Sequence, residues 1–360
     1  MWFKTFGGSL AITAVGLTAA YIYAGPAGLA LAAILGVLEF TLSFDNAVVN
    51  ATVLRTMNAF WQKLFLTLGV VVAVVGMRLA FPLLVVGITA GLSPASAISL
   101  AMQRGDPHTE GSYGYLLHEA HPAIAAFGGV FLLMLFCDFV FERREITWMG
   151  WLERPLARIG QLDQLSIAVT LIVVSVAAVE FASESKSTTV LISGVLGLVT
   201  YVLVNALAAR FDPERHSGRG TSAAVMKVGK AALMSFLYLE VLDASFSFDG
   251  VVGAFAITSD PIIIAIGLGL IGATFVRSLT VFLVRQRTLE EYIYLEHGAH
   301  WAIGALAVLL LCTIRFDIPE LVTGSIGIGF IGLAFISSIV RNKRSAPSVA
   351  QGDSLETART

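Results

Sequence analysis

Apolar runs of roughly 18 or more residues recur along the whole chain, and such runs are the signature of membrane-spanning helices. Only 13% of the 360 residues are charged, against about 25% in an ordinary soluble domain. The pattern therefore predicts an all-α polytopic membrane protein. The expected spans, ten in all, are 8–24, 28–54, 64–90, 123–141, 165–182, 188–209, 231–258, 262–284, 299–314 and 320–340.

Basic residues are divided unevenly between the two sides that these spans define. With the N-terminus in the cytoplasm, 18 of the 23 lysines and arginines fall on the cytoplasmic side and 3 on the other. The positive-inside rule favours this orientation. It predicts a multi-pass protein of a bacterial cytoplasmic (inner) membrane with both termini inside. The net charge of −2 and the lack of a basic tract argue against nucleic acid binding.

Two short motifs occur twice, in the same order. EFTLSFDNAVV at 39–49 aligns with DASFSFDGVVG at 243–253, and YLLHEAHPAIAA at 115–126 aligns with YLEHGAHWAIGA at 294–305. One deep arginine lies between the motifs in each half of the chain. Ten spans divide into five and five, and because five is odd, the two halves must cross the membrane in opposite directions. This is the inverted-repeat plan of many secondary transporters, whose sites lie near the midplane.

The repeat predicts three regions. The first five-helix repeat is expected at 1–182 and the second at 183–340, followed by a polar cytoplasmic tail at 341–360 that is expected to be disordered.

Carboxylates lie near the middle of spans, where an ionised side chain is costly and a functional role is the default interpretation. The spans contain four such acids but only two deep arginines. Ion pairs between them therefore leave about two negative charges, which a divalent cation or protons would balance. Ion pairing with the arginines alone is the structural alternative. The expected metal site consists of Glu39, Asp45, Asn46, Asp243 and Asp249, with Arg78 and Arg277 as counter-charges.

Glu39 and Asp45 are six residues apart, which on a straight helix separates them by about 120°. They converge only if the helix unwinds between them or faces a wide polar cavity. The hydroxyls at Thr41–Ser43 and Ser245–Ser247 suit a broken span in each motif, as in the broken helices of transporters. The candidate ligand atoms are carboxylate, amide and hydroxyl oxygens, and such ligands favour Mg²⁺, Ca²⁺ or Mn²⁺ over Zn²⁺ or Cu⁺. The hydroxyls could equally serve helix packing. The possible additional ligands are Glu240, Thr41, Ser43, Ser245 and Ser247.

Two histidine pairs stand at span entrances with i, i+3 spacing: His118 with His121, and His297 with His300. Such pairs could load a metal or relay protons. The alternative is an interfacial helix start anchored by the tyrosine of each motif.

An acidic residue followed six positions later by Asp is the feature by which the chain resembles the TerC family of integral membrane proteins. Glu39 with Asp45 and Asp243 with Asp249 carry this resemblance. The family is named for tellurium resistance and several members are linked to manganese export, so the resemblance implies manganese export here. The second motif departs from the family pattern at Gly250, and the chain looks closest to a subgroup catalogued only as a domain of unknown function.

These observations predict a non-enzymatic secondary transporter without a resident cofactor, which exports a divalent cation, Mn²⁺ above all. No nucleotide-binding motif is seen in the sequence, so proton exchange or the membrane potential would drive transport. Three alternatives were considered: an accessory protein for metal delivery or a tellurium-resistance complex, with a protein partner at the basic cytoplasmic loops; an exporter of a small cationic metabolite such as an amino acid; and an intramembrane aspartyl hydrolase. The hydrolase is disfavoured because SFSF precedes Asp249 instead of a Gly-x-Gly motif.

Overall fold

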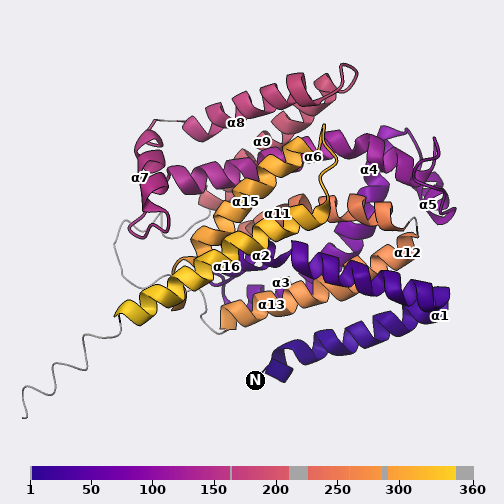
Figure 1. The fold of residues 1–360 in the computed structure, drawn as a ribbon, viewed down its shortest axis with the longest axis horizontal. Coiled ribbons are helices and arrows are strands. Elements are labelled where there is room, and N and C mark those ends of the chain that lie inside the picture. The colour runs from indigo at the N-terminus through magenta and orange to yellow at the C-terminus, as the bar shows by residue number, and fades with distance from the viewer. Residues whose placement is uncertain (1, 163, 211–225, 259, 286–290, 346–360) are drawn as a thin grey trace, which may run out of the picture.

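The computed structural model describes residues 2–162, 164–210, 226–258, 260–285 and 291–345, and helices account for nearly all of these residues (Figure 1). Within those ranges, six helices are long and apolar enough to cross a membrane, and two shorter apolar helices accompany them. No β-strand forms in the described residues beyond an isolated bridge between Met57 and Lys227. The chain is an all-α, multi-pass membrane protein, as its hydrophobic pattern predicts.

The helices of the first half follow the expected spans closely. A π-helical segment, η1, interrupts the third expected span, and η2 ends the fifth. In order, the elements are α1 (Trp2–Leu42), α2 (Phe44–Leu54), α3 (Ala59–Val71), η1 (Val72–Ala80), α4 (Phe81–Thr89), α5 (Pro94–Met102), α6 (Tyr113–Phe141), α7 (Gly150–Ile159), α8 (Leu165–Val176) and η2 (Ala177–Phe181).

The second half shows a similar order. Its elements are α9 (Ser187–Arg210), α11 (Gly229–Ile257), α12 (Pro261–Ile264), η3 (Ala265–Gly272), α13 (Ala273–Arg285), α15 (Leu295–Cys312) and α16 (Glu320–Ser345). A π-helical segment lies close to the deep arginine of each half: η1 contains Arg78, and η3 ends before Arg277.

Some expected boundaries are wrong because polar loops also contain helix starts. The outer loop expected at 91–122 contains α5 and the beginning of α6. Ser93 and Ser112 cap these two helices by accepting backbone N–H groups, the usual role of serine at an N-cap. The helix α16 runs to Ser345, so the first part of the expected tail is helical. Residues 346–360 of that tail lie outside the described residues.

Two interruptions shape the N-terminal part of the chain. The helix α1 bends at Ala24 and Gly25, where Gly25 has φ of 65°, a conformation that glycine adopts without a steric penalty. This bend separates the first two expected spans. A second interruption follows at Ser43 (φ −98°, ψ 16°), between α1 and α2. The chain therefore leaves regular helix between Glu39 and Asp45, as their spacing predicts.

The second motif behaves differently. Helix α11 continues without interruption from Gly229 to Ile257, so the expectation of a second broken helix at Ser245–Ser247 is wrong. Serine is tolerated inside helices, so the two hydroxyl residues do not by themselves interrupt α11.

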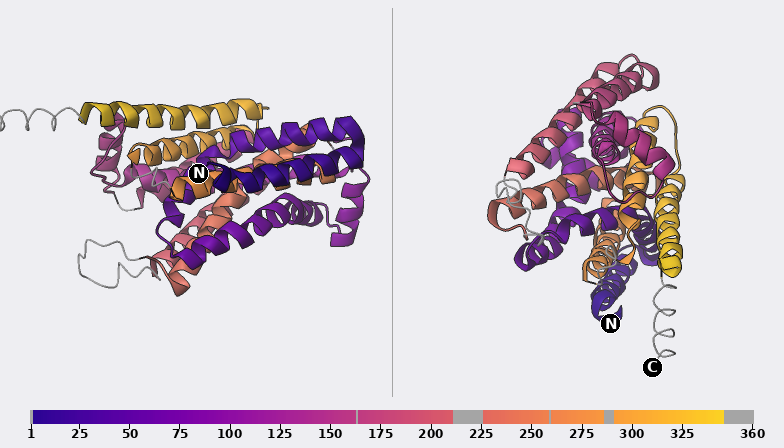
Figure 2. Two further views of the ribbon diagram at one scale, coloured as in Figure 1. Left: turned by 90° about the horizontal axis from the view of Figure 1, so that it is seen from below. Right: turned by 90° about the vertical axis from the view of Figure 1, so that its left-hand side faces the viewer.

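Long helices lie side by side along the bundle, whereas α5 and α7 lie across its two ends (Figures 1 and 2). The core is formed where α6 and α15 meet. A Cβ added at Gly129 would contact Leu311, and one added at Gly304 would contact Phe136. These contacts show that α6 and α15 pack closely and run in opposite directions, as small residues at membrane helix interfaces permit.

Candidate ion site at the crossing of two motif helices

A buried ion pair forms at the break between α1 and α2. Arg78, on η1, donates to the carboxylate of Glu39. The Ser43 hydroxyl, at the break itself, donates to the same carboxylate over 2.7 Å. The Arg78 and Glu39 side chains are only 4% and 3% exposed. Because each charge would be costly in this environment without the other, the pair fixes η1 against the end of α1.

A second group of charges comes from α11 and α13. Arg277, on α13, interacts electrostatically with Asp243 and Glu240 of α11, and its guanidinium carbon lies 4.0 Å from the centre of the Phe65 ring. Gly69 of α3 makes room for this group: a Cβ there would lie 2.6 Å from Arg277 Nη2 and 2.8 Å from Glu240 Oε1. Each deep arginine therefore lies beside carboxylates of its own half.

The two groups meet where α1 and α2 cross α11. The Asn46 amide, in the first turn of α2, donates to Asp243 Oδ1. On the other side of the crossing, Oε2 of Glu39 lies 3.5 Å from the position of a Cβ at Gly250. In the repeat, Asn46 aligns with Gly250 and Glu39 aligns with Asp243. The Asn46–Asp243 contact is therefore the counterpart of the Glu39–Gly250 contact, with the two halves exchanged. The segments run in opposite directions here, which fits two inverted halves; the inversion of the whole repeat stays a prediction.

Close backbone approach is needed on a second side of Glu39. A Cβ added at Gly272, the last residue of η3, would overlap Cβ and Cγ of Glu39. Glu39 of the first half thus lies against two glycines of the second half, and of these two only Gly272 is too close to accept a Cβ.

A small cavity lies among these side chains. Its volume is about 20 Å³, which is room for one water-sized particle. Polar side chains of several kinds surround it, and they come from both halves of the chain. Its polar lining comprises the carboxylates of Glu39 and Asp243, the amides of Asn46 and Asn50, the guanidinium groups of Arg78 and Arg277, and the Thr280 hydroxyl.

Several predicted ligands lie on these helices, but their side chains are outside the described residues: Thr41, Asp45, Ser245, Ser247 and Asp249. Among the side chains that are described, no group of three or more His, Cys, Asp or Glu residues could hold a metal ion. The described part of the site therefore provides one carboxylate from each half, together with the two counter-charges.

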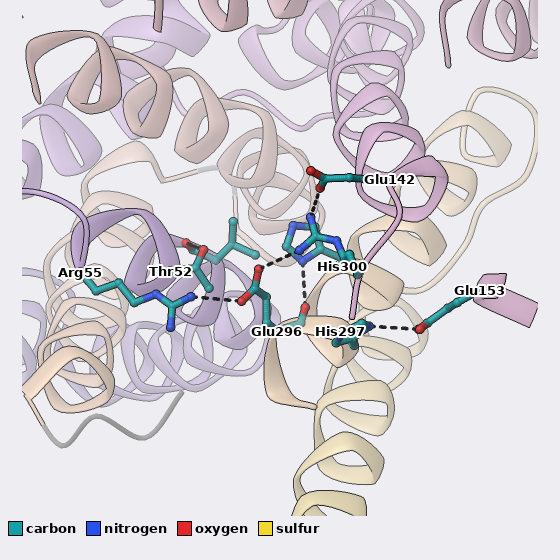
Figure 3. A network of polar contacts seen from close by, with 9 residues as sticks. Thr52, Arg55, Glu142, Glu153, Glu296, His297 and His300 are labelled. Carbon is teal, nitrogen blue, oxygen red and sulfur yellow. Dashed lines mark hydrogen bonds and ion pairs between the residues drawn. The ribbon is translucent and has the colours of Figure 1, made fainter. Parts of the chain in front are cut away.

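The second histidine pair belongs to a different network, at the end of the bundle where α7 lies (Figure 3). His297 Nδ1 lies 3.1 Å from Glu153 Oε1, and His300 Nδ1 lies 2.8 Å from the Glu296 carbonyl. The rings of both histidines pack on Phe139. These contacts hold the first turns of α15 against α7 and the end of α6.

The first histidine pair lies at the opposite end, because α6 and α15 are antiparallel. The rings of His118 and His121 stack with their centres 6.3 Å apart. The structure thus separates the two pairs, and among the described residues neither pair lies beside Glu39 or Asp243.

Residues that the sequence did not single out also contribute polar groups within the spans. Asn50, one turn after Asn46, and Thr280 line the cavity; helical spacing from Asn46 was the available signal for Asn50. Asp138, near the end of α6, accepts a hydrogen bond of 2.8 Å from the Tyr201 hydroxyl. It has no counterpart in the paired motifs and lies close to a helix end, so the repeat did not draw attention to it.

Comparison with known proteins gives a family. The family described as "Protein of unknown function (DUF475)" matches residues 44–345, most of the chain. The chain belongs to this family. The resemblance to a group catalogued only by unknown function is thus confirmed, and the match does not extend to the name TerC. No curated protein and no solved structure matches the chain.

Proposed function

We propose that this DUF475 protein is a secondary transporter that exports a divalent metal cation, with Mn²⁺ as the expected substrate. The observation that carries the proposal is the ion-sized cavity between the two motif helices, which receives Glu39 from one half and Asp243 from the other. A site built at the interface of two halves is typical of transporters that expose it alternately to the two sides.

The charges around the cavity support a cation with two positive charges. Glu39 and Asp243 are balanced by Arg78 and Arg277 among the residues that line it. Asp45 and Asp249 belong to the same two motifs and would add two negative charges. A divalent cation would neutralise them, and protons would do so on the return step of the cycle.

The oxygen donors and the family resemblance together favour Mn²⁺. Carboxylate, amide and hydroxyl oxygens suit hard cations. Among such cations, Mn²⁺ is the one that the resemblance of the paired motifs to the TerC family implies. The accompanying metal ligands are proposed to be Asp45, Asn46 and Asp249.

The test is metal flux into liposomes that contain only the purified full-length protein, with Mn²⁺, Mg²⁺, Ca²⁺ and Zn²⁺ compared. We expect flux of Mn²⁺ that Asp45→Asn and Asp249→Asn each abolish. Asp317→Asn is a matched control, because this exposed aspartate lies outside the motifs, and it should leave the flux unchanged. Absence of flux for every ion, from folded protein in both orientations, would refute transport and favour the accessory role. Competition by an amino acid instead of a metal would favour the cationic-metabolite exporter.

A further inference from the structure

A larger pocket opens at the end of the bundle where α7 lies, away from the candidate ion site. Its volume is about 250 Å³. It is enclosed by the end of α6, the segment that follows, α7 and the first turn of α15. Four arginines and two glutamates line it, which gives a formal charge of +2 with His297 neutral. The four arginines are Arg143, Arg144, Arg154 and Arg158.

Three of these arginines have their charge available for a ligand. The side chains of Arg143, Arg154 and Arg158 form no ion pair or hydrogen bond with any residue that the structure describes, and all three are exposed. Arg144 is engaged instead: its guanidinium contacts Glu142 over 2.6 Å and Glu296 over 3.5 Å.

The buried glutamate of the pocket does not neutralise them. Glu153 accepts hydrogen bonds from the Trp301 indole over 3.0 Å and from the Trp148 backbone N–H over 3.0 Å. Its other contact is His297 (Figure 3). Its negative charge is already counted in the total of +2, and among the described residues it forms no ion pair with these arginines, so a net positive charge remains in the pocket.

The outer face of α7 carries exposed apolar side chains beside two of the arginines. Trp151 is 78% exposed and Ile159 is 52% exposed, and Arg154 and Arg158 stand one turn apart beside them. A short helix with exposed aromatic and aliphatic side chains next to arginines is typical of a helix lying in the membrane interface. The helix crosses the end of the bundle instead of running along it (Figures 1 and 2), as that position requires.

We propose that this pocket binds the phosphate group of an anionic membrane lipid, with Arg154 and Arg158 as its principal ligands and Trp151 and Ile159 against the acyl chains. Arginine presents a planar set of donors that matches phosphate oxygens. Basic pockets beside membrane helices on the cytoplasmic side are suited to anionic headgroups. Soluble phosphate shares the headgroup chemistry but would make no use of the apolar face of α7.

The experiment measures ligand-dependent thermal stabilisation of the full-length protein in a neutral detergent. The probes are phosphatidylglycerol, phosphatidylcholine and inorganic phosphate. Of the three probes, we expect only phosphatidylglycerol to raise the unfolding temperature. Since each basic residue near an anionic surface strengthens binding about five-fold, Arg154→Gln/Arg158→Gln should weaken the apparent affinity about thirty-fold. Lys343→Gln/Arg344→Gln is the matched control, because it removes the same charge from the exposed end of α16 and should retain wild-type binding.

Three results would overturn the proposal. Equal stabilisation by phosphatidylcholine would show that charge is not recognised. Equal affinity of the two double variants would show that the pocket is not the binding site. Stabilisation by inorganic phosphate at the same concentration as the lipid would assign the pocket to a soluble anion. Metal flux is not a readout here, so the outcome is independent of the proposed transport function.

Discussion

Gly272→Ala should destabilise the protein, because the added methyl group would occupy the space of the Glu39 side chain. The built Cβ overlaps Cβ and Cγ of Glu39, atoms close to the α1 backbone that cannot move away by rotating the end of the side chain. Overpacking of this kind costs about 1–3 kcal/mol. Because the overlap is with atoms close to the backbone, the upper part of that range, about 2–3 kcal/mol, applies here. Alanine is favoured over glycine in a helix by about 1 kcal/mol, so the expected net loss is about 1–2 kcal/mol.

Gly250→Ala is the matched control, since it also adds a methyl group beside Glu39. Its Cβ would lie 3.5 Å from Glu39 Oε2 and 3.9 Å from Leu268 Cδ2, which are ordinary contact distances. The helix preference for alanine then dominates, and stability should be unchanged or higher by up to about 1 kcal/mol.

The free energies of unfolding can be compared by titrating purified protein in mixed micelles with a denaturing detergent, followed by tryptophan fluorescence. The reasoning fails if Gly272→Ala is as stable as the wild type. It also fails if the two glycine variants lose the same amount, because the close approach of Glu39 to Gly272 is what distinguishes them.

Two further perturbations probe the buried charges. Arg78→Met should cost about 3–5 kcal/mol by leaving Glu39 buried without its partner, and adding Glu39→Gln should recover most of this loss in the same unfolding assay; an additive double variant would contradict the ion pair. For Glu153, burial acts to raise the pKa, but hydrogen bonds from His297, Trp301 and the Trp148 backbone outweigh it, so the pKa is held below its ordinary value of 4.5. A lowered carboxyl pKa contributes stability at pH values above 4.5 that is lost as the pH falls through the folded-state pKa. Unfolding midpoints of the wild type should therefore decline below about pH 4.5 more steeply than those of Glu153→Gln; parallel curves would refute this.

Much of the fold follows from the sequence because apolar length is a strong signal in a membrane protein. The bend at Gly25 and the break at Ser43 were also predictable, the first from a Gly-Pro pair and the second from the spacing of Glu39 and Asp45. Helices inside polar loops were not predicted, although Ser93 and Ser112 carried the signal of an N-cap.

The candidate site was predictable as a set of charges but not as a set of contacts. Sequence alone gave Gly250 as a missing donor and therefore as a weakness of the second motif. The structure shows that Gly250 lies at contact distance from the Glu39 carboxylate, and this depends on the crossing of helices from different halves, which no local pattern contains. The same limitation applies to Gly69, whose small size matters only because Arg277 lies against it.

The exchanged contacts at the helix crossing make the two copies of the motif unequal in size. Glu39 is longer than Asp243 by one methylene group and faces glycine, whereas the shorter Asp243 faces asparagine. The longer acid therefore has the smaller neighbour. The Glu39–Gly250 contact leaves room for an added methyl group, whereas the Asn46 amide fills the corresponding space beside Asp243. Substitutions at equivalent positions of the two motifs are therefore expected to have unequal effects, and one copy can vary more freely than the other.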